Sequence, residues 1–515
     1  MNRTLNLHKS WLTPITALGL LTWTTASLVA DTVISLDAND TGRIFEGVNV
    51  VSAVTSSHTS SDIYGQKQTL AASDSAVSFQ HADIGVAQTP QKSFPDAPNK
   101  RALWFEKSGL GLFIHYGLPS VAEGMYDLSW SMVKGTGYDK RFEGKNKLTP
   151  NVYYALAKQF NPTQYNPDKW LKAAKEAGFK YAVFTTRHHD GFALWPSNFG
   201  DLSTKNYMGG RDLVGEYVAA CRKNGIKVGF YYSPPDWYRE RLYRSWGRGT
   251  PPLGMDHQPV DTLPPKPTDF DQTTAEYLNG QIRELLMQYG KVDYLWFDGS
   301  AKGILSQEEI RQLQPDIIMN DRQHGNGDVI TSKYECQLPK ERPNHLWEHP
   351  FCMTGNGAFW GYTKPLECLP SNVIPAKLVR AQAWRGNVLA NFGPQANGEM
   401  PPEYYQCMRE VKTWMSWAET AIHEVTAAPK PDPCTQPVTV NGNTWYVHLL
   451  PQTIDGPASS NEVTIAEKRK SKHITWLKTG EPLNSVPDKD RLRIQVPEQL
   501  RTDWVDIIKI EWADE

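Results

Sequence analysis

The middle of the chain, residues 98–424, alternates short apolar runs with amphipathic stretches, and this pattern constrains the fold most. The runs end in polar or aromatic residues and read GLGLFIHYG, KYAVFTTRHH, KVGFYYSPP, VDYLWFDGS, DIIMNDR, NHLWEHP and NVLANFGP. Predicted helices such as NPDKWLKAAKEAG and RDLVGEYVAACRKNG separate them, and several stop at a glycine: Gly178, Gly225 and Gly290. Apolar strands alternating with helices are typical of a parallel sheet covered on both faces. The length of the region favours a (β/α)8-type, TIM-like barrel.

A doubly wound open sheet is the alternative fold for the same alternation. It would place its polar residues at one or two crevices, whereas here most of the runs end in polar residues. No GxGxxG motif follows an early strand. Both observations favour the barrel.

The two ends of the chain have different compositions from the middle. Residues 1–30 carry Arg3 and Lys9, then an apolar stretch, then Leu-Val-Ala before Asp31, which predicts a secretory signal peptide cleaved near Ala30. Residues 31–97 are rich in Ser, Thr and Gln and are interpreted as an N-terminal extension and linker. Residues 425–515 alternate apolar and polar residues between turn signals, which predicts an antiparallel β-sandwich.

Charge and cysteine content narrow the function classes. The formal net charge is −2, from 54 basic and 56 acidic residues, so nothing favours nucleic acid or an anionic membrane as a partner. We expect no membrane span in the mature chain and a secreted or periplasmic location, lysosomal or extracellular if eukaryotic. The six cysteines show neither CxxC pairs nor zinc-finger spacing, so the sequence does not indicate a disulfide connectivity. It does not indicate the oligomeric state either.

Polar residues at the ends of the predicted strands are the candidates for chemistry. In a barrel such residues gather at one face, where they build an active site. They are His115, His188, His189, Tyr231, Tyr232, Asp298, Asn320, Asp321, Arg322 and Glu348. Asp298 follows the apolar run Tyr294 to Phe297 directly. A sugar hydrolase that retains configuration needs a second carboxyl group near such a residue, and Glu335 and Glu348 are both candidates.

The order and spacing of these motifs resemble the α-L-fucosidases of glycoside hydrolase family 29, across about residues 98 to 410. The resemblance rests on FIHYG, TTRHHDGFALWPS, VGFYYS, LWFDG, NDR and NVLANFGPQANGEMPP. It implies a retaining exo-hydrolase of terminal α-L-fucose, with a fucosylated oligosaccharide, polysaccharide or glycoprotein as substrate. It also implies Asp298 as the nucleophile. The fucose-binding residues that it implies are His115, His188, His189, Tyr232 (alternatively Tyr231), Trp296 and Arg322.

The acid/base and one sugar contact vary within this family. Glu335 is the preferred acid/base and Glu348 the alternative, and an apolar setting is expected to raise the pKa of Glu335 so that it stays protonated. Where the family usually has Glu-Trp, this chain has Ser129-Trp130. Trp130 can still form an aromatic wall of the sugar site. Because the carboxylate is missing, a site selective for fucose and one that accepts related L-sugars are both compatible with the sequence.

Two other functions are compatible with the sequence. A metal-dependent barrel hydrolase would use His115, His188, His189 and Asp298 as ligands, but adjacent histidines rarely direct both rings at one ion. A non-catalytic or altered-specificity L-sugar-binding relative would have no need of a nucleophile, which the retention of Asp298 argues against. The preferred mechanism needs neither a metal nor a cofactor.

Overall fold

The computed structural model describes residues 59–61, 67–69, 74–87, 100–122, 127–135, 148–354, 359–453 and 456–514. The chain divides into two compact units, Met1–Ser56 and Ser57–Glu515, and every described residue lies in the second. The predicted signal peptide therefore lies outside the described residues. Among the helices that are described, none has the length and apolar character needed to cross a membrane.

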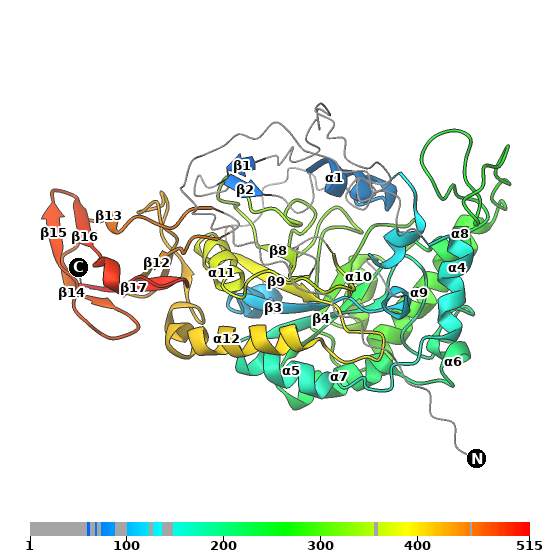
Figure 1. The fold of residues 1–515 in the computed structure, drawn as a ribbon, viewed down its shortest axis with the longest axis horizontal. Coiled ribbons are helices and arrows are strands. Elements are labelled where there is room, and N and C mark those ends of the chain that lie inside the picture. Colours follow the sequence, from blue (N-terminus) through cyan, green and yellow to red (C-terminus); the bar gives the residue numbers. More distant parts are fainter. Residues whose placement is uncertain are drawn as a thin grey trace, which may run out of the picture. The chain divides into compact units, whose positions relative to one another are not determined.

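A parallel sheet at the centre of the second unit forms the barrel (Figure 1). Its strands run in the order β7-β6-β5-β4-β3-β9-β8, and every neighbouring pair is parallel. The bounds are β3 Leu110–Ile114, β4 Tyr181–Arg187, β5 Lys227–Tyr232, β6 Tyr294–Phe297, β7 Ile318–Met319, β8 Trp347–Cys352 and β9 Gly386–Phe392.

The barrel closes through a very short eighth segment between β7 and β8. Val329 forms a parallel bridge to Asn320, just after β7, and Ile330 forms another to Trp347 of β8. Backbone hydrogen bonds support this, because Ile330 N–H donates to Leu346 O at 3.0 Å and Glu348 N–H donates to Ile330 O at 3.1 Å. The predicted (β/α)8-type fold is confirmed.

Helices follow the barrel strands as the sequence pattern predicts. The longer ones are α5 Pro167–Glu176, α7 Leu213–Lys223, α9 Phe270–Gln288, α10 Gln307–Leu313, α11 Val373–Ala383 and α12 Pro402–Ala418, and the shorter ones are α2 Leu103–Glu106, α4 Pro150–Ala155, α6 Thr204–Tyr207 and α8 Trp237–Glu240. Asn166 and Asp212 cap α5 and α7 with their side chains. Gly178 and Gly225 follow these two helices with φ of 94° and 62°, which only glycine adopts readily.

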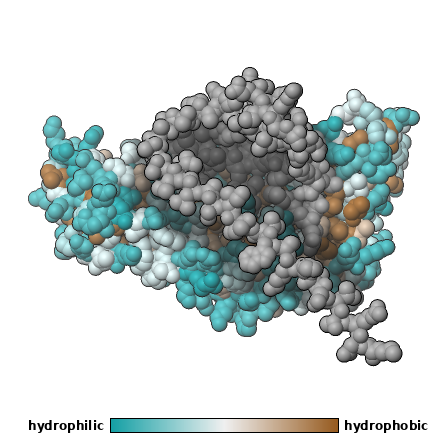
Figure 2. Space-filling model, viewed as in Figure 1, coloured by the Kyte–Doolittle hydropathy of each residue, from teal (hydrophilic) through white to brown (hydrophobic). Residues whose placement is uncertain are grey.

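Two antiparallel sheets follow the barrel. One contains β10 Thr426–Ala427, β11 Val438–Asn441, β12 Thr444–Leu449, β14 Ser471–Trp476 and β17 Asp506–Trp512; the other contains β13 Glu462–Ala466, β15 Ser485–Asp488 and β16 Arg491–Gln495. One apolar core joins them, because Val447 and Ile510 of the first sheet and Ile465 of the second belong to the same buried cluster. The outward face visible in Figure 2 is mainly hydrophilic. This arrangement is a C-terminal β domain.

Within the described residues, a strand pair and a helix stand well ahead of the first barrel strand in the sequence. β1 Thr59–Ser61 and β2 Lys67–Thr69 pair antiparallel, and α1 Asp74–Asp83 follows them. In Figure 1, α1 lies on the opposite side of the barrel strands from α5, α7 and α12. The sequence pattern does not predict α1, which nevertheless contributes to the site described next.

Candidate active site

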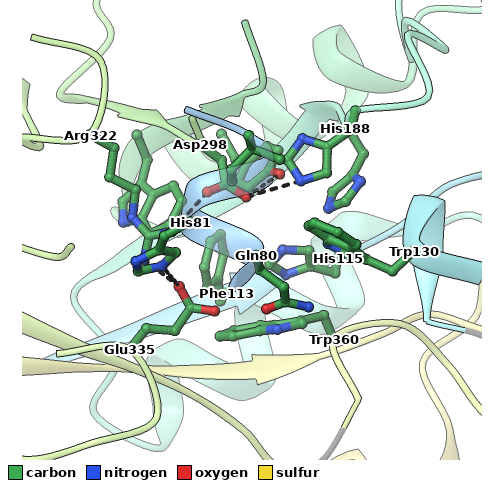
Figure 3. Close-up of a pocket in the computed structure, with 14 residues that line it drawn as sticks. Gln80, His81, Phe113, His115, Trp130, His188, Asp298, Arg322, Glu335 and Trp360 are labelled. Carbon is green, nitrogen blue, oxygen red and sulfur yellow. Dashed lines mark hydrogen bonds and ion pairs between the residues drawn. The ribbon is translucent and has the colours of Figure 1, made fainter. Parts of the chain in front are cut away.

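A pocket lies at the carboxyl ends of the barrel strands (Figure 3). Seven of the fourteen lining residues lie within two positions of the end of β3, β4, β5 or β6, as the sequence predicts for a barrel site. The lining residues are Gln80, His81, Ile84, Phe113, His115, Trp130, His188, His189, Tyr231, Trp296, Asp298, Arg322, Glu335 and Trp360. The pocket therefore combines two carboxyl groups, histidines and aromatic faces.

Asp298 follows β6 and is held from both sides. Arg322 Nη1 donates to its Oδ1 at 2.8 Å, and the Tyr231 hydroxyl donates to its Oδ2 at 2.7 Å. Arg322 is itself buried and lies over the Trp296 ring, 4.4 Å from the ring centre. These contacts fix the orientation of the carboxylate toward the pocket.

Glu335 shares Arg322 with Asp298. Arg322 Nη2 lies 2.5 Å from Glu335 Oε2, and His81 Nε2 lies 2.9 Å from the same oxygen. Burial acts to raise the pKa of Glu335, but the Arg322 charge and the contact with His81 outweigh it and hold the pKa well below its ordinary value. The expectation that an apolar setting raises this pKa is therefore wrong, because two donors face one carboxylate oxygen.

Glu348 lies beneath the pocket, not in it. Tyr181 donates to its Oε1 at 2.6 Å, and Trp296 Nε1 and Tyr294 donate to its Oε2 at 2.9 and 3.3 Å. Burial raises the pKa of Glu348 to about 7, although these hydrogen bonds act to lower it. Of the two candidate acid/base residues, the structure brings only Glu335 to the pocket that contains Asp298.

Replacing Glu348 with Gln should flatten the dependence of stability on pH. The folded-state pKa is raised from 4.5 to about 7, so the folded protein binds more protons in this window, and stability is lost as pH rises through it. A shift of this size corresponds to about 3 kcal/mol. Urea unfolding should show that, between pH 5 and pH 8, the wild type loses about 3 kcal/mol more of its free energy of unfolding than the variant does.

The matched control for this measurement is Glu276→Gln, at an exposed position of α9. It should leave the pH dependence of the wild type unchanged. A Glu348→Gln variant with the wild-type pH dependence would contradict the buried, protonated state of Glu348.

His115 and His188 present complementary hydrogen-bonding atoms. His115 Nδ1 lies 2.7 Å from Asn391 Oδ1, and Asn391 Nδ2 donates to Trp360 O at 2.7 Å, so the histidine donates from Nδ1 and keeps Nε2 as an acceptor. His188 Nδ1 lies 2.6 Å from Ser129 Oγ. Burial lowers the pKa of His115 to about 4 and that of His188 well below its ordinary value, so both rings are neutral.

His189 has an unpartnered nitrogen in the pocket. Its Nδ1 lies 2.6 Å from Ser233 Oγ, which donates to Pro235 O at 3.1 Å, so Nδ1 carries the hydrogen. Burial holds the pKa of His189 well below its ordinary value. Nε2 is buried without a hydrogen bond, 3.6 Å from Asp298 Oδ2. The unpaired Nε2 can accept a hydrogen bond from a ligand hydroxyl.

Tyr231, not Tyr232, faces the pocket. Successive side chains of a strand point to opposite faces, and the Tyr232 hydroxyl accepts from Arg187 Nη1 at 2.8 Å and lies 3.0 Å from Gln281 Oε1 of α9, outside the barrel. Tyr231 stacks on His188 and Trp296 inside the barrel. The sequence-based preference for Tyr232 as a sugar contact is corrected accordingly.

Ser129 has a structural task that the sequence does not reveal. Its hydroxyl oxygen accepts from Asp190 N–H at 2.9 Å and lies 2.6 Å from His188 Nδ1. The hydroxyl hydrogen is thus available to Nδ1, which would leave Nε2–H of His188 to donate into the pocket. The predicted aromatic wall is in place, because Trp130 lines the pocket beside His189.

Several lining residues are absent from the sequence-based prediction. Phe113 lies within β3, and Trp360 packs on the His115 ring from the loop after β8, with 5.0 Å between ring centres. Gln80, His81 and Ile84 come from α1 and the turn after it. The aromatic FWGY stretch was the one available signal for Trp360, and nothing in the sequence around α1 points to the barrel.

The metal-ligand reading of the histidines can be tested against these contacts. Ligand atoms of His188, His189 and Asp298 lie within 4.8 Å of one another. However, the Arg322 guanidinium and the Tyr231 hydroxyl already hold the two oxygens of Asp298. A fixed cation beside the carboxylate disfavours a second one, so the arrangement fits a metal poorly.

Two carboxyl groups at barrel strand ends, surrounded by neutral histidines and aromatic faces, define the site of a glycoside hydrolase. The sequence model of the α-L-fucosidase family matches residues 79–419. The chain belongs to this family, glycoside hydrolase family 29.

Individual relatives agree with this assignment. The tissue α-L-fucosidase of Mus musculus is 28% identical over 365 residues, covering 66% of this chain and 75% of that protein. The structure of α-L-fucosidase isoenzyme 1 from Paenibacillus thiaminolyticus is 30% identical with a TM-score of 0.66, covering 81% of this chain and 99% of that one. A Bacteroides thetaiotaomicron fucosidase, trapped as a covalent intermediate with 2-fluoro-fucosyl fluoride, shares the fold at 24% identity and a TM-score of 0.64, covering 84% of this chain and 99% of that one.

Proposed function

We propose that this protein is a retaining exo-α-L-fucosidase that releases terminal L-fucose from fucosylated glycans. One observation carries the proposal: Asp298 and Glu335 enter the same pocket, and the guanidinium of Arg322 bridges them. Family membership gives the substrate class, and the paired carboxyl groups give the reaction type.

The proposed reaction has two displacements. In the first, Asp298 attacks the anomeric carbon and forms a glycosyl ester, while Glu335 gives its proton to the departing glycosidic oxygen. In the second, Glu335 takes a proton from water as the water oxygen attacks the same carbon, and Asp298 leaves as a carboxylate. Two inversions restore the α configuration, and Glu335 regains the proton that it donated.

The other pocket residues provide sites for the sugar ring. His115 Nε2 and His189 Nε2 are acceptors and His188 Nε2–H is a donor, so neutral imidazoles can satisfy several hydroxyl groups once water has left. Trp130, Trp296 and Trp360 line the same pocket. Their faces suit the apolar C–H faces and the methyl group of a 6-deoxy sugar.

Hydrolysis of 4-nitrophenyl α-L-fucoside by the wild type, followed by proton NMR, tests the proposal. The first anomer of fucose to appear should be α, before mutarotation. A β product would exclude double displacement. An enzyme inert on the fucoside but active on the α-L-galactoside would favour the altered-specificity alternative, which the Ser129 substitution raises.

Export is proposed as well, with cleavage after Ala30. The support is the basic, apolar and small-residue order of residues 1–30. N-terminal sequencing of the protein recovered from the exported fraction of its host should begin at Asp31. A chain that retains Met1 and stays inside the cell would contradict this proposal.

A further inference from the structure

A histidine from outside the barrel reaches the candidate acid/base. His81 lies in α1, ahead of the first barrel strand, and its Nε2 is 2.9 Å from Glu335 Oε2 (Figure 3). Only 12% of the His81 side chain and 8% of the Glu335 side chain are exposed. The contact is therefore shielded from solvent, where a hydrogen bond is stronger than at the surface.

Backbone contacts attach the end of α1 to the loops that carry the catalytic groups. Ala87 N–H donates to Arg322 O at 2.8 Å, and Ser300 N–H donates to Ile84 O at 3.0 Å. Ser300 lies two positions after Asp298 in the chain. In addition, Arg244 pairs with Asp83 at 3.4 Å. The position of His81 is thus determined by the same loops that position Asp298 and Arg322.

The two oxygens of Glu335 have different surroundings. Oε2 faces both His81 Nε2 and Arg322 Nη2. Within the described part of the chain, no hydrogen-bond donor is recorded for Oε1, which Figure 3 draws turned away from His81. A carboxyl group anchored through one oxygen holds the other in a fixed direction, which is what proton transfer to a leaving group requires.

We propose that His81 is a positioning residue for the acid/base Glu335, and that α1 forms part of the leaving-group side of the active site. The inference rests on the proposed function, because it assigns His81 a task in the acid-assisted step. Removing His81 should weaken the catalysis that depends on Glu335 and leave attack by Asp298 nearly unchanged.

Leaving-group dependence separates this role from a general structural one. Departure of 2,4-dinitrophenolate needs little protonation, whereas departure of phenol or of a sugar alcohol needs the acid. With phenyl α-L-fucoside, His81→Ala should lower kcat/KM by about 10- to 100-fold, a part of the usual contribution of an acid catalyst. With the 2,4-dinitrophenyl fucoside kcat/KM, which reports formation of the ester with Asp298, should stay within about threefold of the wild type.

The pH profile gives a second readout. The titratable and charged groups around Glu335 are His81, Arg322, Asp298, His115, Tyr231 and Cys352. Because the His81 contact is one of the causes that hold the pKa of Glu335 down, its loss should move the limb of kcat/KM assigned to Glu335 to higher pH. A structural loss that left the environment of Glu335 unchanged would lower activity without this displacement.

Variants and controls complete the experiment. His81→Gln keeps a side-chain N–H and should recover most of the phenyl fucoside activity that His81→Ala loses. His473→Ala, at an exposed position of β14, should match the wild type on both substrates. In a Glu335→Ala background, His81→Ala should cause no further loss, because the group that it positions is gone.

The results of these experiments test the role of His81 and the fucosidase activity separately. An equal loss of kcat/KM on both fucosides, or no loss on either, with an active wild type would overturn the role of His81 alone. A wild type inert on every fucoside would overturn the proposed function, and the inference with it. If His81→Ala does not fold, His81→Gln takes its place in the experiment. Equal losses of kcat/KM on both substrates in His81→Gln would then overturn the inference. A loss of activity in His81→Gln with an unshifted pH limb would overturn it as well.

Discussion

Replacing Asp298 with Asn should abolish hydrolysis of every α-L-fucoside, including those with good leaving groups. The amide cannot form the glycosyl ester, so kcat should fall by about 10⁴-fold or more, as when other enzymes lose a nucleophile. Asn keeps the size of the side chain: its Oδ1 can still accept from Arg322, and its Nδ2 can donate to the Tyr231 hydroxyl oxygen, where Asp298 accepts from both groups in the wild type. The loss therefore reports the chemistry rather than a disrupted pocket.

Chemical rescue by azide is the second part of this prediction. In Asp298→Gly, azide should enter the space left by the carboxylate, attack the anomeric carbon from that face and displace the leaving group in one step. A single inversion gives β-L-fucosyl azide, which NMR identifies. The matched control is Asp293→Asn, just before β6, where Asp293 accepts from Lys227 Nζ at 3.0 Å and Val228 N–H at 3.0 Å. It should retain the wild-type mechanism, and retention of activity in Asp298→Asn would contradict the assignment.

The strand-end positions could be predicted because they depend on local sequence. An apolar run followed by a polar residue places that residue at the barrel mouth, as for His115, His188 and Asp298. The pattern was ambiguous where two like residues are adjacent. Tyr231 and Tyr232 both end β5, and only the strand register decides which one faces inward.

Contacts between distant segments could not be predicted. The eighth barrel segment contains only Val329 and Ile330, too few residues for an alternation to be visible. His81 lies 254 positions before Glu335, in a polar helix with little amphipathic pattern. The pKa of Glu335 was misjudged for the same reason. It depends on Arg322 and His81, whose approach to one oxygen is a property of the folded chain.

The electrostatics of Glu335 make the acid step depend on pH. Because its pKa is held below the ordinary value in the free enzyme, only a small fraction of the free enzyme carries the catalytic proton at neutral pH. For substrates that need acid assistance, kcat/KM should therefore rise as pH falls below neutrality, over the range in which the protein stays folded. Activated fucosides should lack this dependence.

Replacing Glu335 with Gln should separate substrates by their leaving groups. The amide cannot donate the proton or activate water, so kcat/KM on phenyl α-L-fucoside should fall by about 10²- to 10⁴-fold. On 2,4-dinitrophenyl fucoside the first displacement should survive, and the ester with Asp298 should accumulate because its hydrolysis lacks a base. A burst of dinitrophenolate equal to the enzyme concentration, followed by slow turnover, is the expected trace.

Azide and Glu348→Gln test the same assignment from two directions. Azide needs no general base, so it should accelerate turnover of Glu335→Ala and give α-L-fucosyl azide, the retained product of two inversions. Glu348→Gln should show neither burst nor rescue, since Glu348 hydrogen-bonds Tyr181, Tyr294 and Trp296 beneath the pocket. If the burst and the retained azide appear in the Glu348 variant instead, the acid/base is Glu348. The pocket must then open in solution to expose a residue that is fully buried in this structure.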